Sequence, residues 1–349
     1  MNHTIRLDSG LELNSFDVTF RTYGELNSFK SNAIFIFHPL SFGLEGFALA
    51  DQDKCWWTKI VGPGKCLDTN KYCLILGSIT SIAEQVKELS PEEDELFLTF
   101  DDVVRMQKHI TDYLGISEIY AVTGGSYGSM TALAYTARYP VKRAVIISAT
   151  YKAHINQIMI RGVQAKLLDF MLSNSDYTPE MVGLVKLIVL LHYRKLNIYE
   201  SFLKSESDVN TYLLRACEKM SANVDLRLYK NSLKMMDHFD VSEKIRETDT
   251  EFFILAVTSD NMYTVEQLRS FHDDLISKGI NSSFEIIDSN KGHDTFLMDE
   301  EKLMNVQEKE YETLNNIDNS MCNKDNLSFD FNIPSPSLET SVSNVKLNI

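Results

Sequence analysis

The segment Gly124-Gly125-Ser126-Tyr127-Gly128 contains a G-x-S-x-G pattern. An apolar run over residues 119–123 precedes it and predicts a buried strand, and a helical pattern over residues 130–138 follows it. On a tight turn between a strand and a helix, a serine hydroxyl stands clear of the sheet at the helix N-terminus. A glycine-rich turn with an incidental serine would also fit the pentapeptide, but the flanking elements favour a nucleophile at Ser126.

A serine nucleophile needs a base, and that base needs an acid to orient it. After a G-x-S-x-G turn of this kind, the expected chain order is serine, then an acid, then histidine. His293 comes just after a predicted strand over residues 283–287, at the sheet edge where such a base belongs. His38 precedes the serine, whereas His192 and His238 fall in a helical region, where packed or surface positions are expected.

The acid is expected at the end of the preceding predicted strand, which covers residues 251–257. Asp260 follows that strand and precedes a helical pattern. Asp288 follows the next strand and is the alternative, although a turn or helix cap is its more usual role. The sequence therefore predicts the catalytic set Ser126, Asp260 and His293.

A serine mechanism also needs two donors for the developing oxyanion. The residue after the nucleophile supplies one backbone N–H, which here is that of Tyr127. The second comes from the loop after an early strand, where the sequence is His38-Pro39-Leu40-Ser41. Because proline has no N–H, Leu40 is the expected second donor.

The surrounding pattern predicts the fold that must position these groups. Apolar runs alternate with helical patterns, which is typical of an α/β fold with a mostly parallel sheet and helices on both faces. A hairpin is expected over residues 4–22, and a helix over 101–114 that ends at Gly115. The remaining predicted strands cover residues 33–37, 72–76, 119–123 and 144–147.

The helical pattern continues without a clear strand from residue 151 to 245 and interrupts the α/β pattern. This region is expected to form a lid inserted over the carboxyl edge of the sheet. A tail rich in Asn, Ser and Asp is expected to lie on the surface or be mobile, with Phe329 and Phe331 able to dock. The predicted parts are an α/β-hydrolase core over 1–150 and 246–305, a helical lid over 151–245, and a polar tail over 306–349.

Composition limits the class of partner. The 349 residues include 34 Lys and Arg against 49 Asp and Glu, a net charge of −15. Such acidity disfavours nucleic acids and anionic membranes as partners and leaves a small molecule or another protein. The apolar run Met181 to Tyr193, interrupted by Lys186, spans about 13 residues, short of the roughly 20 needed to cross a bilayer. A buried helix or a subunit interface, as in a homodimer, is expected there.

Five scattered cysteines without a C-x-x-C pair predict neither a metal site nor a disulfide framework. The first ten residues carry no apolar signal-peptide core. Together these features favour a cytoplasmic enzyme with reduced thiols.

Several motifs, taken together, resemble the homoserine O-acetyltransferase family. The similarity covers residues 4–150 and 245–300, is poor across the helical insert and is absent from the tail. The motifs are Tyr23-Gly24-Glu25-Leu26-Asn27, Ser31-Asn32-Ala33-Ile34, Trp56-Trp57, Gly62-Pro63-Gly64-Lys65-x-x-Asp68-Thr69, the segment around Ser126 with Arg138-Tyr139-Pro140, Thr258-Ser259-Asp260, and Gly292-His293-Asp294-x-Phe296-Leu297.

The resemblance implies an acyltransferase of amino-acid biosynthesis with ping-pong kinetics. Ser126 would take an acyl group, expected to be acetyl, from acyl-CoA and pass it to the hydroxyl of homoserine or a related amino alcohol. Acyl-CoA is then a co-substrate, no cofactor is held, and no metal is needed. The helical insert would exclude water and would supply the surface of a homodimer.

Departures from the family pattern concern the acceptor. The arginine that binds the homoserine carboxylate in the family falls on Gln164 here, with Arg161 one turn earlier on the same helical face. Arg161 can replace it, or can be a surface residue of a redrawn lid. Asp294, which in the family meets the substrate's amine, is present, although it can equally be a structural acceptor in its loop. The acceptor therefore need not be homoserine.

Further departures lie close to the nucleophile. Tyr127 stands where the family usually has Met, and Ser78-Ile79-Thr80-Ser81 replaces a glycine-rich segment. Two alternatives to acyl transfer remain open from the residues. One is a serine esterase or thioesterase that uses the same triad with water as acceptor, and the other is a non-catalytic assembly role for the helical insert.

Overall fold

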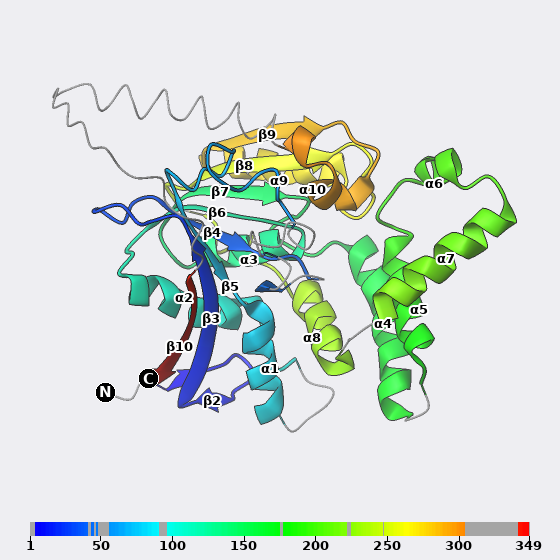
Figure 1. Ribbon diagram of the computed structural model, residues 1–349, viewed down its shortest axis with the longest axis horizontal. Helices are drawn as coiled ribbons and strands as arrows, with labels where there is room; N and C mark the ends of the chain where they lie inside the picture. Colours follow the sequence, from blue (N-terminus) through cyan, green and yellow to red (C-terminus); the bar gives the residue numbers. More distant parts are fainter. Residues whose placement is uncertain are drawn as a thin grey trace.

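The computed structural model describes residues 4–40, 43–44, 47, 56–90, 96–174, 177–221, 225–246, 248–303 and 341–348. Its centre is an eight-stranded sheet with the order β10-β3-β5-β4-β6-β7-β8-β9 (Figure 1). The strands from β5 to β9 along this order run parallel, whereas β3 and β10 are antiparallel to their neighbours. The strands are β3 Ser15–Tyr23, β4 Ala33–Phe37, β5 Cys73–Gly77, β6 Ile119–Gly125, β7 Val141–Ile147, β8 Glu251–Val257, β9 Ser282–Ile287 and β10 Ser341–Asn348.

The central strands form because their residues are apolar on both faces. All five residues of β4 are buried, and they alternate between two hydrophobic clusters. Phe35 and Phe37 belong to the first cluster, and Ile34 and Ile36 belong to the second. A strand buried on both faces reads as a continuous apolar run, which is typical of the inner strands of a parallel sheet.

The first cluster is closed by helices α1 Ile79–Leu89, α2 Phe100–Leu114, α3 Tyr127–Thr136 and α9 Val265–Ser277. Helix α2 begins with a capping box between Thr99 and Asp102 and ends at Gly115, whose φ of 70° places it in the left-handed region, as predicted. The second cluster is covered by Trp56, Trp57 and the short helix α10 Thr295–Met298. Both faces of the sheet are therefore covered, which confirms the predicted α/β-hydrolase fold class.

The chain between β7 and β8 is helical, as the sequence predicts. Helix α8 contacts both α1 and α4, which joins this region to the sheet layer. Figure 1 shows α4, α5, α6 and α7 to one side of the sheet, with α8 between them and the sheet. The helices are α4 Ile155–Ser173, α5 Pro179–Leu190, α6 Leu196–Phe202, α7 Glu206–Ser221 and α8 Leu226–Asp237.

The structure differs from the sequence prediction at the N-terminus and in the tail. Only β1 Ile5–Arg6 and β2 Glu12–Leu13 form the hairpin, because β3 leaves it and joins the main sheet. The tail contains a strand, since β10 pairs along its own full length with β3, from Ser341↔Thr22 to Asn348↔Ser15. An edge strand offers unpaired backbone groups, and β10 satisfies those of β3. Phe329 and Phe331 lie outside the described residues.

The helix predicted from residue 130 begins earlier, at Tyr127, because the turn at Ser126 passes directly into it. Where the chain is described, no helix combines the length and apolar character that a membrane crossing requires.

Candidate active site

Ser126 occupies the turn between β6 and α3 and has a strained backbone. Its φ of 54° and ψ of −114° are unusual for a residue with a side chain. A hydrogen bond of 2.9 Å from its N–H to the carbonyl of Ile147 ties the turn to the neighbouring strand β7. A Cβ atom on Gly128 would overlap the carbonyl oxygen of Phe37, so glycine is required for α3 to approach β4. The G-x-S-x-G pattern therefore reflects the packing of the turn.

The imidazole of His293 joins the predicted serine and acid. Its Nε2 lies 2.7 Å from Ser126 Oγ, and its Nδ1 lies 2.8 Å from Asp260 Oδ2. The other carboxylate oxygen of Asp260 accepts the backbone N–H groups of Met262 and Tyr263 at 2.8 and 3.0 Å. Asp260 and His293 are only 1% and 4% exposed. The acid is thus fixed by the turn after β8, and it fixes the ring of the base.

The loop that carries His293 is held by residues from two other parts of the chain. Gly292 has a φ of 64° and donates its N–H to Ser259 Oγ at 2.9 Å. The N–H of His293 donates to the carbonyl oxygen of Tyr193, in the helical insert, at 2.7 Å. A side chain on Gly292 would overlap that same carbonyl group. The insert therefore contacts the base loop through the backbone as well as through side chains.

Four effects set the protonation of His293. Burial lowers its pKa, but the charge and the hydrogen bond of Asp260 raise it, and the charge of Asp294 raises it further. The net pKa lies above the usual 6.5. A base that must be neutral to accept the serine proton then becomes less available as the pH falls through this raised value.

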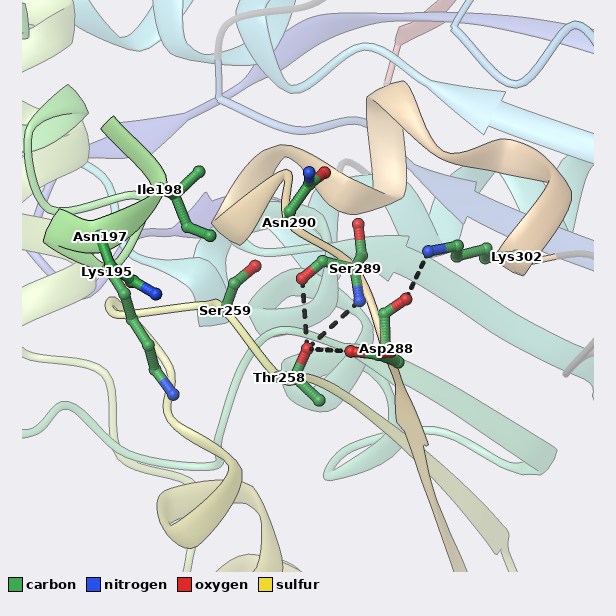
Figure 2. Close-up of a pocket in the computed structure, with 9 residues that line it drawn as sticks. All are labelled: Lys195, Asn197, Ile198, Thr258, Ser259, Asp288, Ser289, Asn290 and Lys302. Atoms are coloured by element: carbon green, nitrogen blue, oxygen red, sulfur yellow. Dashed lines mark hydrogen bonds between the residues drawn. The ribbon is translucent and has the colours of Figure 1, made fainter. Parts of the chain in front are cut away.

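Asp288, the alternative acid, lies elsewhere. Its Oδ1 accepts the hydroxyl of Thr258 at 3.0 Å, and its carbonyl oxygen accepts Lys302 Nζ at 2.5 Å. Figure 2 shows these contacts around a polar hollow of about 470 Å³, which Thr258, Ser259 and Ser289 also line. Asp288 therefore braces the loop that leads into Asp260 and does not contact the base.

The two predicted oxyanion donors lie at one edge of the sheet. Tyr127 is the first residue of α3, where a backbone N–H has no partner within the helix. Leu40 follows β4, whose Phe37 pairs with Gly124 of β6. Their role in binding an oxyanion stays a prediction.

The side chain of Tyr127 has a task that the sequence did not indicate. Its ring packs against Phe100 with centroids 4.8 Å apart, and its hydroxyl lies 3.4 Å from Met235 Sδ on α8. The residue after the nucleophile thus anchors a helix of the insert.

Arg161 and Gln164 share a buried face of α4. Arg161 is 2% exposed, so the alternative of a surface arginine is wrong. Its Nε lies 2.5 Å from Asp237 Oδ1 on α8, while its Nη2 has no hydrogen-bond partner among the described residues. Gln164 Nε2 contacts the carbonyl oxygen of Val185 and the hydroxyl of Tyr229, each at 2.9 Å. Both predicted acceptor residues therefore join helices of the insert.

Asp294 already has a cationic partner. Its Oδ2 lies 3.0 Å from Arg194 Nη2, and the two side chains are 21% and 12% exposed. The expectation of a structural acceptor in the base loop is therefore met in part.

The sequence analysis did not identify three residues that lie in the insert or beside the base. The rings of Tyr193 and Tyr263 pack against His293 with centroids 5.0 and 5.7 Å away. Lys186 Nζ lies 5.5 Å above the ring of Tyr229, and burial alone lowers its pKa. The signal for Lys186 was present, because it is the charge that interrupts the apolar run from Met181.

Among the residues that the structure describes, no group of three or more His, Cys, Asp and Glu is placed to hold a metal ion.

Comparison with known proteins places this geometry in a family. A family model described as alpha/beta hydrolase fold matches residues 63–300. The homoserine O-acetyltransferase of Methanohalobium evestigatum is 30% identical over 85% of this chain and 69% of its own length. The homoserine O-succinyltransferase of Nitrosospira multiformis is 29% identical over 85% of this chain and 90% of its own.

A crystal structure of homoserine O-acetyltransferase from Bacillus anthracis is similar in fold, with a TM-score of 0.79. It is 20% identical and covers 89% of this chain and 95% of its own. The chain therefore belongs to the α/β-hydrolase fold class. Within that class it is a member of the homoserine O-acetyltransferase family, which confirms the resemblance found in the sequence.

The two candidate acids allow a matched test. We expect Asp260→Asn to lower kcat by roughly 10⁴-fold, because the amide no longer fixes the tautomer of His293 or stabilises its protonated form. Asp288→Asn should keep kcat within about threefold of wild type, because it touches only the supporting loop. The steady-state rate of p-nitrophenol release from p-nitrophenyl acetate measures kcat for both variants. Similar losses in the two variants would contradict the assignment of Asp260.

Proposed function

We propose that this enzyme transfers an acyl group from acyl-CoA to a small hydroxyl acceptor through an acyl-Ser126 intermediate. The observation that carries the proposal is the continuous set of contacts from Asp260 through His293 to Ser126. His293 Nε2 accepts the proton of Ser126 Oγ while that oxygen bonds to the thioester carbon. The N–H groups of Leu40 and Tyr127 stabilise the oxyanion. The C–S bond then breaks, His293 returns the proton to the sulfur, and CoA leaves.

The second half-reaction uses the same groups in reverse. The acceptor hydroxyl gives its proton to His293 and attacks the acyl carbon, and Ser126 Oγ leaves and recovers a proton from His293. Both halves share one base and one oxyanion site, so the kinetics are ping-pong. The helical insert, residues 151–245, acts as the lid that keeps water from the acyl-enzyme.

The acyl group and the acceptor follow from the relatives' names. Curated relatives are named for acetyl and for succinyl transfer to homoserine. We propose acetyl-CoA as the donor and homoserine or a related amino alcohol as the acceptor, in the cytoplasm. Among the described residues, the cysteines at positions 73 and 217 form no disulfide, which is compatible with a reducing compartment.

Intact-mass spectrometry tests the nucleophile and the donor together. Incubation with acetyl-CoA and no acceptor should add one acetyl group to the wild-type chain, and Ser126→Ala should abolish that gain. Succinyl-CoA in parallel identifies the preferred acyl group. Adding homoserine should then remove the label and yield O-acylhomoserine.

Two other outcomes would overturn this proposal. Rapid loss of the acyl label in water, with no dependence on any acceptor, would identify an esterase or thioesterase. Full activity in Ser126→Ala would mean that the chain works without this nucleophile and would favour an assembly role.

A carboxylate on the acceptor would need a cation in the lid. Arg161 is already paired with Asp237, whereas no acidic side chain of the described chain lies within ion-pair distance of Lys186. Lys186 lies over the ring of Tyr229, whose hydroxyl contacts Gln164, and Tyr193 of the same insert packs on His293. We propose that Lys186 binds the acceptor carboxylate. Arg161 through its unpaired Nη2, Gln164 and Asp294 would complete this subsite.

Measuring the two half-reactions separately distinguishes carboxylate binding by Lys186 from a purely structural role. Lys186→Met should raise KM for homoserine by roughly tenfold or more, the cost of one charge-assisted hydrogen bond. It should leave acylation by acetyl-CoA and KM for 3-amino-1-propanol, which lacks a carboxylate, unchanged. Lys166→Met, an exposed lysine on the neighbouring helix α4, is the control. Equal losses with both acceptors would count against the proposal.

The insert also carries an exposed apolar stripe, which supports the predicted homodimer. Its members recur every three or four residues along one face of α4, and all are exposed: Ile155, Met159, Val163, Leu167 and Phe170. A contiguous apolar patch on a surface marks an interaction site. The stripe carries no charge, so in an acidic chain it suits a second copy of itself across a twofold axis.

Sedimentation velocity tests the dimer. The wild-type chain should sediment as a dimer at micromolar concentration, and Val163→Glu should shift it to a monomer because two carboxylates would face each other in the interface. Ile276→Glu, at an exposed apolar position on α9, should leave the dimer intact. A wild-type monomer at every concentration would refute this proposal.

A further inference from the structure

Arg194 connects the helical insert to the loop that carries His293. Its Nε donates to the carbonyl oxygen of Lys291 at 2.9 Å, and its Nη2 donates to Asp294 Oδ2 at 3.0 Å. These two partners lie two residues before and one residue after the histidine. The guanidinium is thus hydrogen-bonded to the base loop on both sides of His293.

The backbone next to Arg194 is fixed to the same site. Arg194 forms an isolated antiparallel bridge with Asp260, the acid of the triad. The preceding carbonyl, that of Tyr193, accepts the N–H of His293. A Cβ atom on Gly292 would overlap the Arg194 side chain, so the loop is shaped to receive it. One short segment of the insert therefore contacts both the acid and the base of the triad.

The ion pair between Arg194 and Asp294 also neutralises a negative charge beside the base. Asp294 follows His293 directly and acts on it electrostatically. Arg194 compensates that carboxylate at 3.0 Å, in a position only 12% exposed, where water screens poorly. Without the guanidinium, His293 would face the charges of Asp260 and Asp294 together.

We propose that Arg194 is a positioning residue of the reaction, which seats the base loop against the helical insert and compensates the charge of Asp294 next to His293. The inference rests on the proposed use of His293 as the base. It extends that proposal, because it makes the basicity of His293 depend on a residue of the lid.

The other groups that face His293 do not reproduce this effect. Asp260 approaches from the end of β8, and Ser126 from the turn before α3. Tyr193 from the insert and Tyr263 from the loop before α9 pack on the ring, and burial raises the pKa of both phenols, so they stay neutral. Arg161, near Tyr263, is compensated by Asp237. Arg194 and Asp294 are thus the pair whose balance can change at this ring.

A charge cycle on this pair tests the proposal. Arg194→Met keeps the length of the side chain and removes its charge, so the pKa of His293 should rise by about half a unit or more. Asp294→Asn should shift it downward. The combined variant should return it toward the wild-type value, because both charges are gone. Arg194→Lys restores charge without the two-sided grip, so it should recover the pKa but not the full kcat.

The acidic limb of the pH profile for kcat/KM reports this pKa in the free enzyme. We would measure it with acetyl-CoA and homoserine, and with p-nitrophenyl acetate, which needs the triad but no recognition of CoA. NMR titration of the His293 ring, assigned with His293→Gln, gives the same pKa without turnover. Arg138→Met, which breaks the ion pair with Asp101 on the helical layer, is the matched control and should not shift it.

The outcomes are distinct. A higher pKa in Arg194→Met that is cancelled by Asp294→Asn supports the proposal. A uniform loss of rate with no shift in pKa, or equal shifts in Arg194→Met and Arg138→Met, would overturn it. Inactivity of the wild-type enzyme with acetyl-CoA would refute the proposed transfer reaction, whereas the NMR titration would still decide the role of Arg194.

Discussion

The strained backbone at Ser126 is the constraint from which the site is built. A residue with a side chain holds a φ of 54° only where its surroundings leave it no alternative. Here the hydrogen bond to Ile147 and the close approach of α3 to β4 at Gly128 supply that restraint. Because β6, β7 and β8 are adjacent and parallel, their carboxyl ends bring the serine turn and the acid turn to one edge of the sheet. The base loop after β9 completes the edge.

Local patterns were sufficient to predict the elements of this edge. Apolar runs matched β4, β6 and β8 closely, and the place of Asp260 between a strand and a helical pattern favoured it over Asp288, for which a turn or helix cap is the more usual role. These predictions succeed because each depends on a strand and the turn that follows it. The edge strand β10 was not predicted. It forms by pairing with β3, more than 300 residues earlier in the chain, and the local pattern of the tail does not indicate that pairing.

The helical insert shows what the sequence alone leaves open. Arg161 and Asp294 were expected to meet the acceptor, and the structure adds that each also has an ion-pair partner far along the chain, Asp237 and Arg194 respectively. Spacing along one helix gives the face on which a residue lies, but it does not give the charge that packs against that face. Lys186 was visible only as an interruption of an apolar run, and its importance depends on what α5 packs against. Ion pairs between distant segments decide which charges a substrate can still reach.

Pairing of β10 with β3 has a consequence for the whole chain. Asn348 lies opposite Ser15, and Thr4 is hydrogen-bonded to Asn14 one residue away, so the first and last described segments meet at one corner of the sheet. The first described segment and β10 therefore lie against adjacent parts of the same stretch of chain, at the β10 side of the sheet. The strands that carry the triad lie farther along the sheet, where β3, β5 and β4 separate β6 from β10.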